Sequence, residues 1–192
     1  ICETLHCIAS DIMNIKPLND GLTNTSFSFD CLGKKYVYRH PGVGTEKYID
    51  RSSEAASMEI AAKLQIDRTF VAMSKDKGWK ISEFITNALA LDYDNWDHVE
   101  KAMELLRKLH QSGEKTNHNF DLIAGIDDFK EKLQASNRFE FDGLDELDQL
   151  IATLIEFLKK DKVEKVLCHG DSYSPNFLLN EQEEMSLIDW EY

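Results

Sequence analysis

The sequence predicts an α+β fold in two parts, a small antiparallel sheet that carries one main helix and then a mostly helical region. Up to residue 85, short stretches with alternating apolar residues surround a single helical segment. After residue 93, apolar residues recur at the three- and four-residue spacing of helices. Strands that gather in one part of a chain and helices in another are typical of α+β proteins. We therefore expect an amino-terminal lobe over 1–85 and a helical carboxy-terminal lobe over 86–192.

The first lobe begins with a short predicted helix and a hairpin. Apolar residues at helical spacing over 2–13 predict a short amphipathic helix. Residues 21–30 and 32–40 form two extended segments around a turn at Gly33, and the alternation of aromatic residues in both predicts a β-hairpin.

The lobe continues with a helix and a second pair of strands. Residues 47–64 are rich in Ala, Glu and Met, which predicts a helix whose inward face carries Glu54, Met58, Ala61 and Gln65. Two more strands are predicted at 70–74 and 78–85, joined by a turn.

In the second lobe, three helices are predicted over 94–110, 126–138 and 143–160. The buried stripe of the first is expected to hold Val99, Met103, Leu106 and His110. The third is expected to bury its apolar residues Leu147, Leu150, Ile151, Leu154, Ile155 and Leu158.

The chain ends in a predicted strand and a short hairpin. A strand over 165–168 leads into a polar loop, and a turn at 180–184 returns the chain to a last strand. Because the final residues continue from that strand into a loop, we expect the carboxy-terminal lobe to be incomplete, with further chain beyond Tyr192 in the natural protein.

Composition narrows the range of partners. Hydrophobic residues make up 42% and charged residues 30% of the 192 residues, as in ordinary globular proteins, and no apolar run approaches the roughly 20 residues of a membrane span. The net charge of −13 repels nucleic acid and anionic lipid. We therefore expect a cytoplasmic protein that binds a small cationic molecule and neither nucleic acid nor membrane. The oligomeric state is left open.

Cysteine spacing argues against a metal or redox motif. None of the four cysteines forms a C-x-x-C pair. Cys168 precedes His169, but neighbours on an extended segment point to opposite faces, so we expect Cys168 to be a small buried residue.

The strongest chemical signal is the segment from His169 through Asp171 to Asn176, followed thirteen residues later by Asp189. Phosphoryl transfer to a hydroxyl needs a carboxylate to receive or orient the proton, and oxygen ligands for Mg²⁺. Asp171 fits the first need, and Asn176 and Asp189 fit the second. The alternative is that Asp171 and Asn176 only form a turn, as these residue types often do.

These residues carry a family resemblance. CHGDSYSPNFLLN (168–180) followed by LIDWEY (187–192) resembles the catalytic and metal loops of the aminoglycoside phosphotransferase and choline kinase superfamily, whose members are related to protein kinases. The segments GLTNTSFSF, KYVYRHPGVGTEKYIDRSSE and GWKISEFI resemble the amino-terminal lobe of that superfamily in the same order. The similarity is greatest to the choline/ethanolamine kinase family, in particular its LicA-type bacterial choline kinases, and it implies a protein-kinase-like bilobal fold.

The resemblance implies roles for the residues of the loop. Asp171 would be the catalytic base, and His169 would support the loop through hydrogen bonds. Asn176 and Asp189 would bind Mg²⁺.

It also implies an ATP site in the first lobe. Arg39 would contact the ATP phosphates and pair with Glu54, a use that suits an always-charged guanidinium. The alternative for this pair is a surface contact of little energetic weight. The remaining implied nucleotide contacts are Asn24, Thr25 and Ser26 at the phosphates, and the backbone of Glu83 and Ile85 at the adenine.

The acceptor implied by the resemblance is choline, which would be converted to phosphocholine. A quaternary ammonium is bound by aromatic faces and carboxylates. The candidates beside the loop are Tyr173, Trp190, Glu191 and Tyr192, each of which could equally be a packing residue. Ethanolamine, an aminoglycoside, or another amino alcohol or sugar remains open as acceptor, as does an inactive nucleotide-binding module.

Overall fold

The structure of the chain is a computed structural model that describes residues 1–18, 24–45, 49–119, 121–136, 142–161 and 164–191. The chain forms two units, one of Ile1–Asn117 with Leu167–Tyr192 and one of His118–Val166. The boundary predicted near residue 85 lies inside the first unit, and the division into lobes at that point stays a prediction. Among the described residues, no helix is both long and apolar enough to cross a bilayer.

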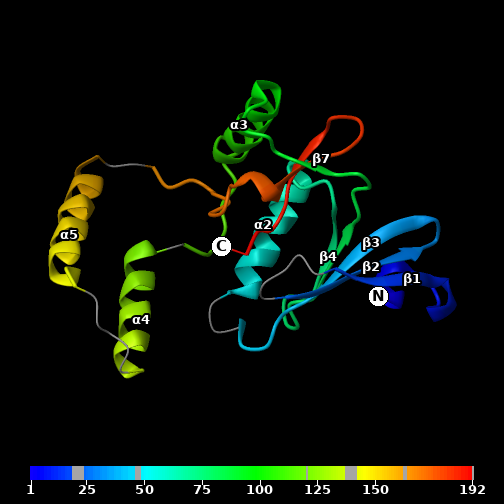
Figure 1. Ribbon diagram of the computed structural model, residues 1–192, viewed down its shortest axis with the longest axis horizontal. Coiled ribbons are helices and arrows are strands. Elements are labelled where there is room, and N and C mark those ends of the chain that lie inside the picture. Colours follow the sequence, from blue (N-terminus) through cyan, green and yellow to red (C-terminus); the bar gives the residue numbers. More distant parts are fainter. Residues whose placement is uncertain (19–23, 46–48, 120, 137–141, 162–163, 192) are drawn as a thin grey trace. The chain divides into compact units, whose positions relative to one another are not determined.

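The first unit contains a five-stranded antiparallel sheet in the order β1-β2-β3-β5-β4 (Figure 1). Its strands are β1 (Ile12–Leu18), β2 (Thr25–Cys31), β3 (Lys34–His40), β4 (Phe70–Met73) and β5 (Lys80–Glu83). Four of them fall where strands are predicted. β1 was not predicted.

The predicted helix over 2–13 is wrong beyond its first turn. Helix α1 (Cys2–Leu5) ends at His6, whose left-handed backbone (φ 52°) closes the helix. A short 3-10 turn, η1 (Ala9–Asp11), then leads into β1. The apolar residues of this segment satisfy a helical pattern, but pairing with β2 supplies backbone hydrogen bonds that an isolated helix this short could not match.

The β2–β3 hairpin is confirmed, and its register decides which side chains share a face. Leu32 (φ 49°) and Gly33 (φ 80°) form the two-residue turn with the positive φ angles that hairpins favour. Phe27 is opposite Tyr38, and their rings stack 5.0 Å apart. Since side chains alternate along a strand, Arg39 lies on the other face of the sheet.

The main helix of this lobe, α2 (Arg51–Lys63), is confirmed within the predicted range. The side chain of Asp50 caps it by accepting hydrogen bonds from the amides of Ser52 (2.9 Å) and Ser53 (3.2 Å). Glu54, Met58 and Ala61 are buried, as predicted. Gln65 lies past the end of the helix and is exposed, so its place on the buried face was wrong.

Helix α3 (Trp96–His110) is also confirmed, and its predicted buried stripe is right at Val99 and Leu106, which pack against the core, and wrong at two positions. Ala102 and Leu109 are fully buried, whereas Met103 is 53% exposed and His110 is exposed.

A second, three-stranded sheet follows the order β6-β7-β8, with β6 (Leu89–Ala90), β7 (Phe177–Leu179) and β8 (Met185–Leu187). The β7–β8 hairpin was predicted and β6 was not. Residues 165–168 form no strand, and Cys168 is exposed, so both of those predictions were wrong. The core of the unit joins this hairpin to the two main helices through Met58, Ala102, Leu109, Phe177, Leu187 and Trp190.

The second unit holds helices α4 (Leu122–Ala135) and α5 (Leu144–Asp161), joined by an ion pair between Lys130 and Asp148. Both helices were predicted, α4 with its start four residues late. The predicted burial of α5 was wrong at four positions, which are 44% to 63% exposed: Leu147, Leu150, Leu154 and Leu158. Ile151 and Ile155 are partly buried. Two helices enclose little volume, so they bury only a narrow stripe.

Candidate active site

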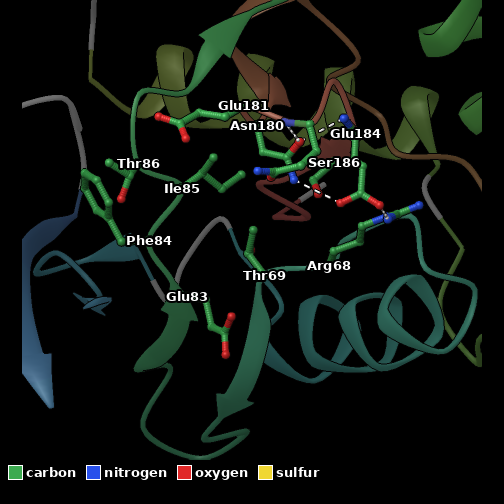
Figure 2. Close-up of a pocket in the computed structure, with 11 residues that line it drawn as sticks. Arg68, Thr69, Glu83, Phe84, Ile85, Thr86, Asn180, Glu181, Glu184 and Ser186 are labelled. Carbon is green, nitrogen blue, oxygen red and sulfur yellow. Dashed lines mark hydrogen bonds and ion pairs between the residues drawn. The ribbon is translucent and has the colours of Figure 1, made fainter. Parts of the chain in front are cut away.

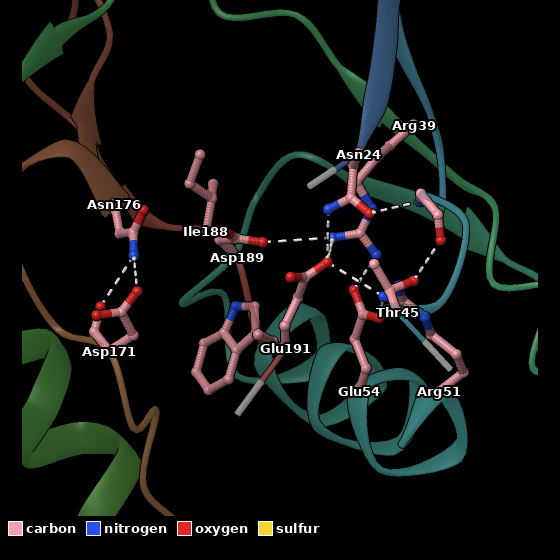
Figure 3. Close-up of polar contacts among 12 residues, drawn as sticks. Asn24, Arg39, Thr45, Arg51, Glu54, Asp171, Asn176, Ile188, Asp189 and Glu191 are labelled. Carbon is pink, nitrogen blue, oxygen red and sulfur yellow. Dashed lines mark hydrogen bonds and ion pairs between the residues drawn. The ribbon is translucent and has the colours of Figure 1, made fainter. Parts of the chain in front are cut away.

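The site is organised around the guanidinium of Arg39, near the end of β3. It pairs with Glu54 of α2, with Glu191 at 2.6 Å and with Asp189 at 3.3 Å (Figure 3). The Arg39 side chain is 7% exposed and that of Glu54 is fully buried. The predicted Arg39–Glu54 pair is therefore confirmed, and the alternative of a weak surface contact is wrong.

A second arginine, Arg51 at the first position of α2, completes this ion cluster. Its guanidinium lies 2.7 Å from Glu54 and 3.1 Å from Glu191, and it donates to the hydroxyl of Thr45 at 2.9 Å. Burial acts to raise the pKa of the Glu191 carboxyl, but Arg39, Arg51 and Asn24 outweigh it, and the pKa is lowered. Glu54 and Glu191 are thus each paired with both arginines. Arg51 was not predicted.

The predicted catalytic loop is held by His169, which is buried. Its Nδ1 accepts a hydrogen bond from the amide of Asp171 (3.2 Å), so in the neutral ring Nε2 carries the proton and donates to the carbonyl of Ile188 (2.9 Å). Burial lowers the pKa of His169, which favours this neutral form. The placement agrees with the supporting role that the resemblance implies, because both ring nitrogens hold backbone groups.

Asn176 links the loop to the segment that bears Asp189. Its Nδ2 donates to the backbone carbonyl of Asp171 (2.9 Å) and to the Asp171 carboxylate (3.2 Å). The amide of Ile188 in turn donates to the carbonyl of Asn176 at 2.9 Å. Together with the His169 bond, this ties 169–176 to 188–189. Figure 3 shows the contacts between Asn176 and Asp171.

Asp189 adopts a left-handed backbone conformation, with φ 69°. This conformation is uncommon outside glycine, and aspartate is among the residues that tolerate it best. Asp189 follows Ile188, whose amide and carbonyl are both hydrogen-bonded to the 169–176 loop. The Asp189 carboxylate is directed at Arg39. Burial raises the pKa of Asp189, while Lys80 and Arg39 oppose that shift.

Lys80 of β5 is a charged neighbour that sequence reasoning missed. It lies directly opposite Arg39 in the β3–β5 register, and residues paired in this way share a face of the sheet. Burial lowers the pKa of Lys80, and Arg39 lowers it further, against Glu54, Asp189 and Asp67. If the register of β5 with β3 had been known, side-chain alternation would have placed Lys80 on the same face of the sheet as Arg39.

The predicted phosphate turn lies beside the ion cluster. Asn24 donates to Glu191 at 2.9 Å and accepts from the amide of Gly42 at 3.3 Å. Ser26 is opposite Arg39 in the sheet and partly buried, and Thr25 is exposed. Asn24 is thus joined to the cluster by a hydrogen bond, and Ser26 lies beside Arg39 through the β2–β3 pairing, whereas Thr25 pairs with His40.

Glu83 and Ile85 lie away from this cluster, on a separate cavity of about 350 Å³ (Figure 2). Its other walls are Arg68, Thr69 and the β7–β8 turn, and Arg39, Asp171, Asn176 and Asp189 do not line it. The Glu83 amide donates to the carbonyl of Thr69 at 2.7 Å. Because the Glu83 amide is already used, the predicted contact of Glu83 with adenine would involve its backbone carbonyl. That contact stays a prediction.

Two of the residues predicted to contact the acceptor lie where a ligand does not reach them. Trp190 is 1% exposed, packs edge-on against His169 at 4.6 Å and donates to the carbonyl of Leu187, so it has no ring face for a ligand. Glu191 is taken up by the ion cluster. Tyr173 is 50% exposed beside Asp171, where a ligand could reach it. Tyr192 lies outside the described residues.

The donor set at the loop fits the metal that was predicted. Within the described ranges, no three His, Cys, Asp or Glu side chains gather as metal ligands. Mg²⁺ commonly takes one or two protein oxygens and completes its shell with phosphate and water. The side-chain nitrogen of Asn176 donates hydrogen bonds to Asp171. The side-chain oxygen of Asn176 is therefore the atom that remains to act as a metal ligand, together with the Asp189 carboxylate.

We predict that removing the charge of Glu54 strongly destabilises the protein. Glu54→Leu leaves Arg39 and Arg51 to share one buried partner, and breaking such a cluster typically costs about 3 kcal/mol. Urea unfolding of the variant and the wild type measures the loss. Glu59→Leu is the matched control, because Glu59 lies on the same helix in an exposed pair with Lys75, and we expect its cost to stay below about 1 kcal/mol. Equal losses in the two variants would contradict the prediction.

Comparisons with known proteins agree with this geometry. The sequence model of the choline/ethanolamine kinase family matches residues 15–192. No curated protein sequence matches the chain directly.

Solved structures of kinases share the fold. The choline kinase LicA from Streptococcus pneumoniae has a TM-score of 0.82 at 24% identity, over 95% of this chain and 64% of that one. LicA in complex with AMP gives a TM-score of 0.79. A choline/ethanolamine kinase family protein from Mesorhizobium loti has a TM-score of 0.74 at 29% identity, over 96% of this chain and 60% of that one.

A Plasmodium vivax ethanolamine kinase is also similar, with a TM-score of 0.71 at 23% identity, over 96% of this chain and 57% of that one. The chain therefore spans less than two thirds of the length of LicA and of these two kinases. The likeness confirms the predicted kinase-like α+β fold. Because the family's sequence model covers nearly all of the chain, the protein belongs to the choline/ethanolamine kinase family.

Proposed function

We propose that this protein is an ATP- and Mg-dependent phosphotransferase that phosphorylates the hydroxyl of choline to give phosphocholine. The observation that carries the proposal is the connection of two loops. Hydrogen bonds through His169, Asn176 and Ile188 hold Asp171 and Asn176 beside the segment of Asp189. A base and two oxygen ligands held in this way meet the needs of phosphoryl transfer.

An unpaired donor supports a phosphate site at Arg39. Its Nε is buried and has no hydrogen-bond partner in the described part of the chain. A buried N–H without a partner is costly, typically by about 1–3 kcal/mol, so an acceptor that reached it would be favoured. A phosphate oxygen is an acceptor that guanidinium groups bind well. When bound, Mg-ATP would supply the phosphoryl group and the metal charge that neutralises it.

The residues of the chain then divide the remaining work. Asp171 accepts the proton of the acceptor hydroxyl, and Asn176 orients that carboxylate through its Nδ2. His169 keeps the loop in place through its two backbone contacts. Glu54 and Glu191 position the Arg39 guanidinium, whose direction would otherwise vary.

Choline as the acceptor rests on charge, on Tyr173 and on the likeness to LicA. A chain with a net charge of −13 favours a cationic ligand. The exposed ring of Tyr173 lies in the same loop as Asp171, and aromatic faces bind quaternary ammonium groups. The similar structures include a choline kinase and an ethanolamine kinase.

An acceptor panel tests the proposal. The protein is incubated with Mg²⁺ and radiolabelled ATP, and with choline, ethanolamine or an aminoglycoside in turn. We expect labelled phosphocholine, with kcat/KM for choline at least tenfold above that of the other acceptors. Preference for another acceptor would replace choline, and ATP binding without transfer to any of them would favour an inactive nucleotide-binding module.

Asp171→Asn should remove most of the transfer activity and leave nucleotide binding intact. A positioned base typically contributes about 10²- to 10⁴-fold, so we expect kcat to fall by a factor in that range while the Kd for ATP changes less than about twofold. Asp76→Asn, in the exposed β4–β5 turn, is the control. Loss of ATP binding to the same extent as kcat would argue against a base role.

Asp189→Asn should abolish the effect of Mg²⁺ on nucleotide binding. Asparagine also tolerates a positive φ, so the backbone is retained while one metal-ligand charge is lost. Titration of ATP with and without Mg²⁺ measures the effect. A Mg²⁺ dependence equal to that of the wild type would exclude Asp189 as a ligand.

A further inference from the structure

Lys80 is the charged side chain near the site that the proposed mechanism does not use. Its position follows from the sheet, since β3 and β5 pair with Arg39 opposite Lys80. Both side chains therefore leave the sheet on the face opposite the aromatic residues of the hairpin. Lys80 is partly buried, and the charged groups that act on it include Arg39, Glu54 and Asp189, all members of the site.

The two cations differ in how they are paired. Arg39 is held by Glu54, Glu191 and Asp189. Within the described ranges, the Nζ of Lys80 makes no hydrogen bond and no ion pair. A partly buried ammonium without a partner gains more from an incoming anion than a guanidinium that already contacts three carboxylates.

The charge balance of the site points the same way. Arg39 and Arg51 carry two positive charges, and Glu54, Glu191 and Asp189 carry three negative charges when ionised. These five groups alone would repel a polyphosphate. The charge of Lys80 offsets the one excess negative charge of these five groups and so favours an incoming phosphate.

We propose that Lys80 is a second phosphate-binding cation, which contacts the part of the nucleotide beyond its α-phosphate. The inference rests on the proposed function. It assigns the β- and γ-phosphates because Lys80 lies opposite Arg39 in the sheet, and Arg39 lies 3.3 Å from Asp189, the proposed ligand of the Mg²⁺ that would accompany those phosphates. A lysine acts here as a point charge, whereas Arg39 is fixed by its carboxylate partners.

The test compares ATP with AMP as probes, using isothermal titration of the full chain. Lys80→Met keeps the length of the side chain and removes its charge. We expect the Kd for ATP to rise about tenfold or more, because the variant loses a charged contact to the outer phosphates, and the Kd for AMP to change less than about twofold. Lys80→Arg should retain most of the ATP affinity. Lys77→Met, at an exposed turn position of the same strand pair, should leave both constants unchanged.

The outcomes separate this inference from the function on which it rests. An unchanged ratio of ATP to AMP affinity in Lys80→Met, in a protein that still transfers phosphate, would overturn the role of Lys80 alone. Absence of ATP binding by the wild type would overturn both proposals. Thermal melting checks that the variant folds, and if Lys80→Met does not, Lys80→Gln provides the same comparison with a polar side chain. Equal weakening of ATP and AMP would indicate a structural role and would also contradict the proposal.

Discussion

The buried contact between Arg39 and two glutamates is the interaction on which the rest of the site depends. It joins a strand of the sheet, the first turn of α2 and the segment after β8, which are far apart in the sequence. None of these charges could be buried alone, because an isolated ion in the protein interior is too costly. Ion pairs therefore help to position α2 against β3, in addition to apolar packing. They also help to position Asp189 beside these two elements.

The loop with His169, Asp171 and Asn176 could be predicted because its chemistry is local. Its residues lie within eight positions of one another, and their order alone indicates a base and a metal ligand. The hairpin and the main helices could be predicted for a similar reason, since their patterns repeat over short windows. β1 and β6 could not, because each exists only through pairing with a strand elsewhere in the chain.

Lys80, Arg51 and Glu191 show where sequence reasoning fails within the site. The importance of Lys80 comes from the register between two strands some forty residues apart, and no local pattern encodes that register. Arg51 precedes Glu54 by three positions, a spacing that is common on exposed helices and gives no sign of burial. Glu191 and Trp190 adjoin Asp189, the proposed metal ligand, in the sequence, and proximity along the chain made both look like acceptor contacts. In the structure Glu191 instead contacts the two arginines, and Trp190 lies in the core.

The backbone of Asp189 restricts how this protein could change over evolution. Its positive φ disfavours branched and bulky side chains, so few replacements keep the turn without strain. Asparagine and glycine would keep the turn, and neither has a carboxylate. Under the proposed role of Asp189, a single substitution in a descendant would remove the metal ligand while the contacts of Arg39 with the glutamates, the sheet and the helices persist. Inactive relatives that retain this architecture are an expected product of such drift, and residue 189 is the first position to inspect in them.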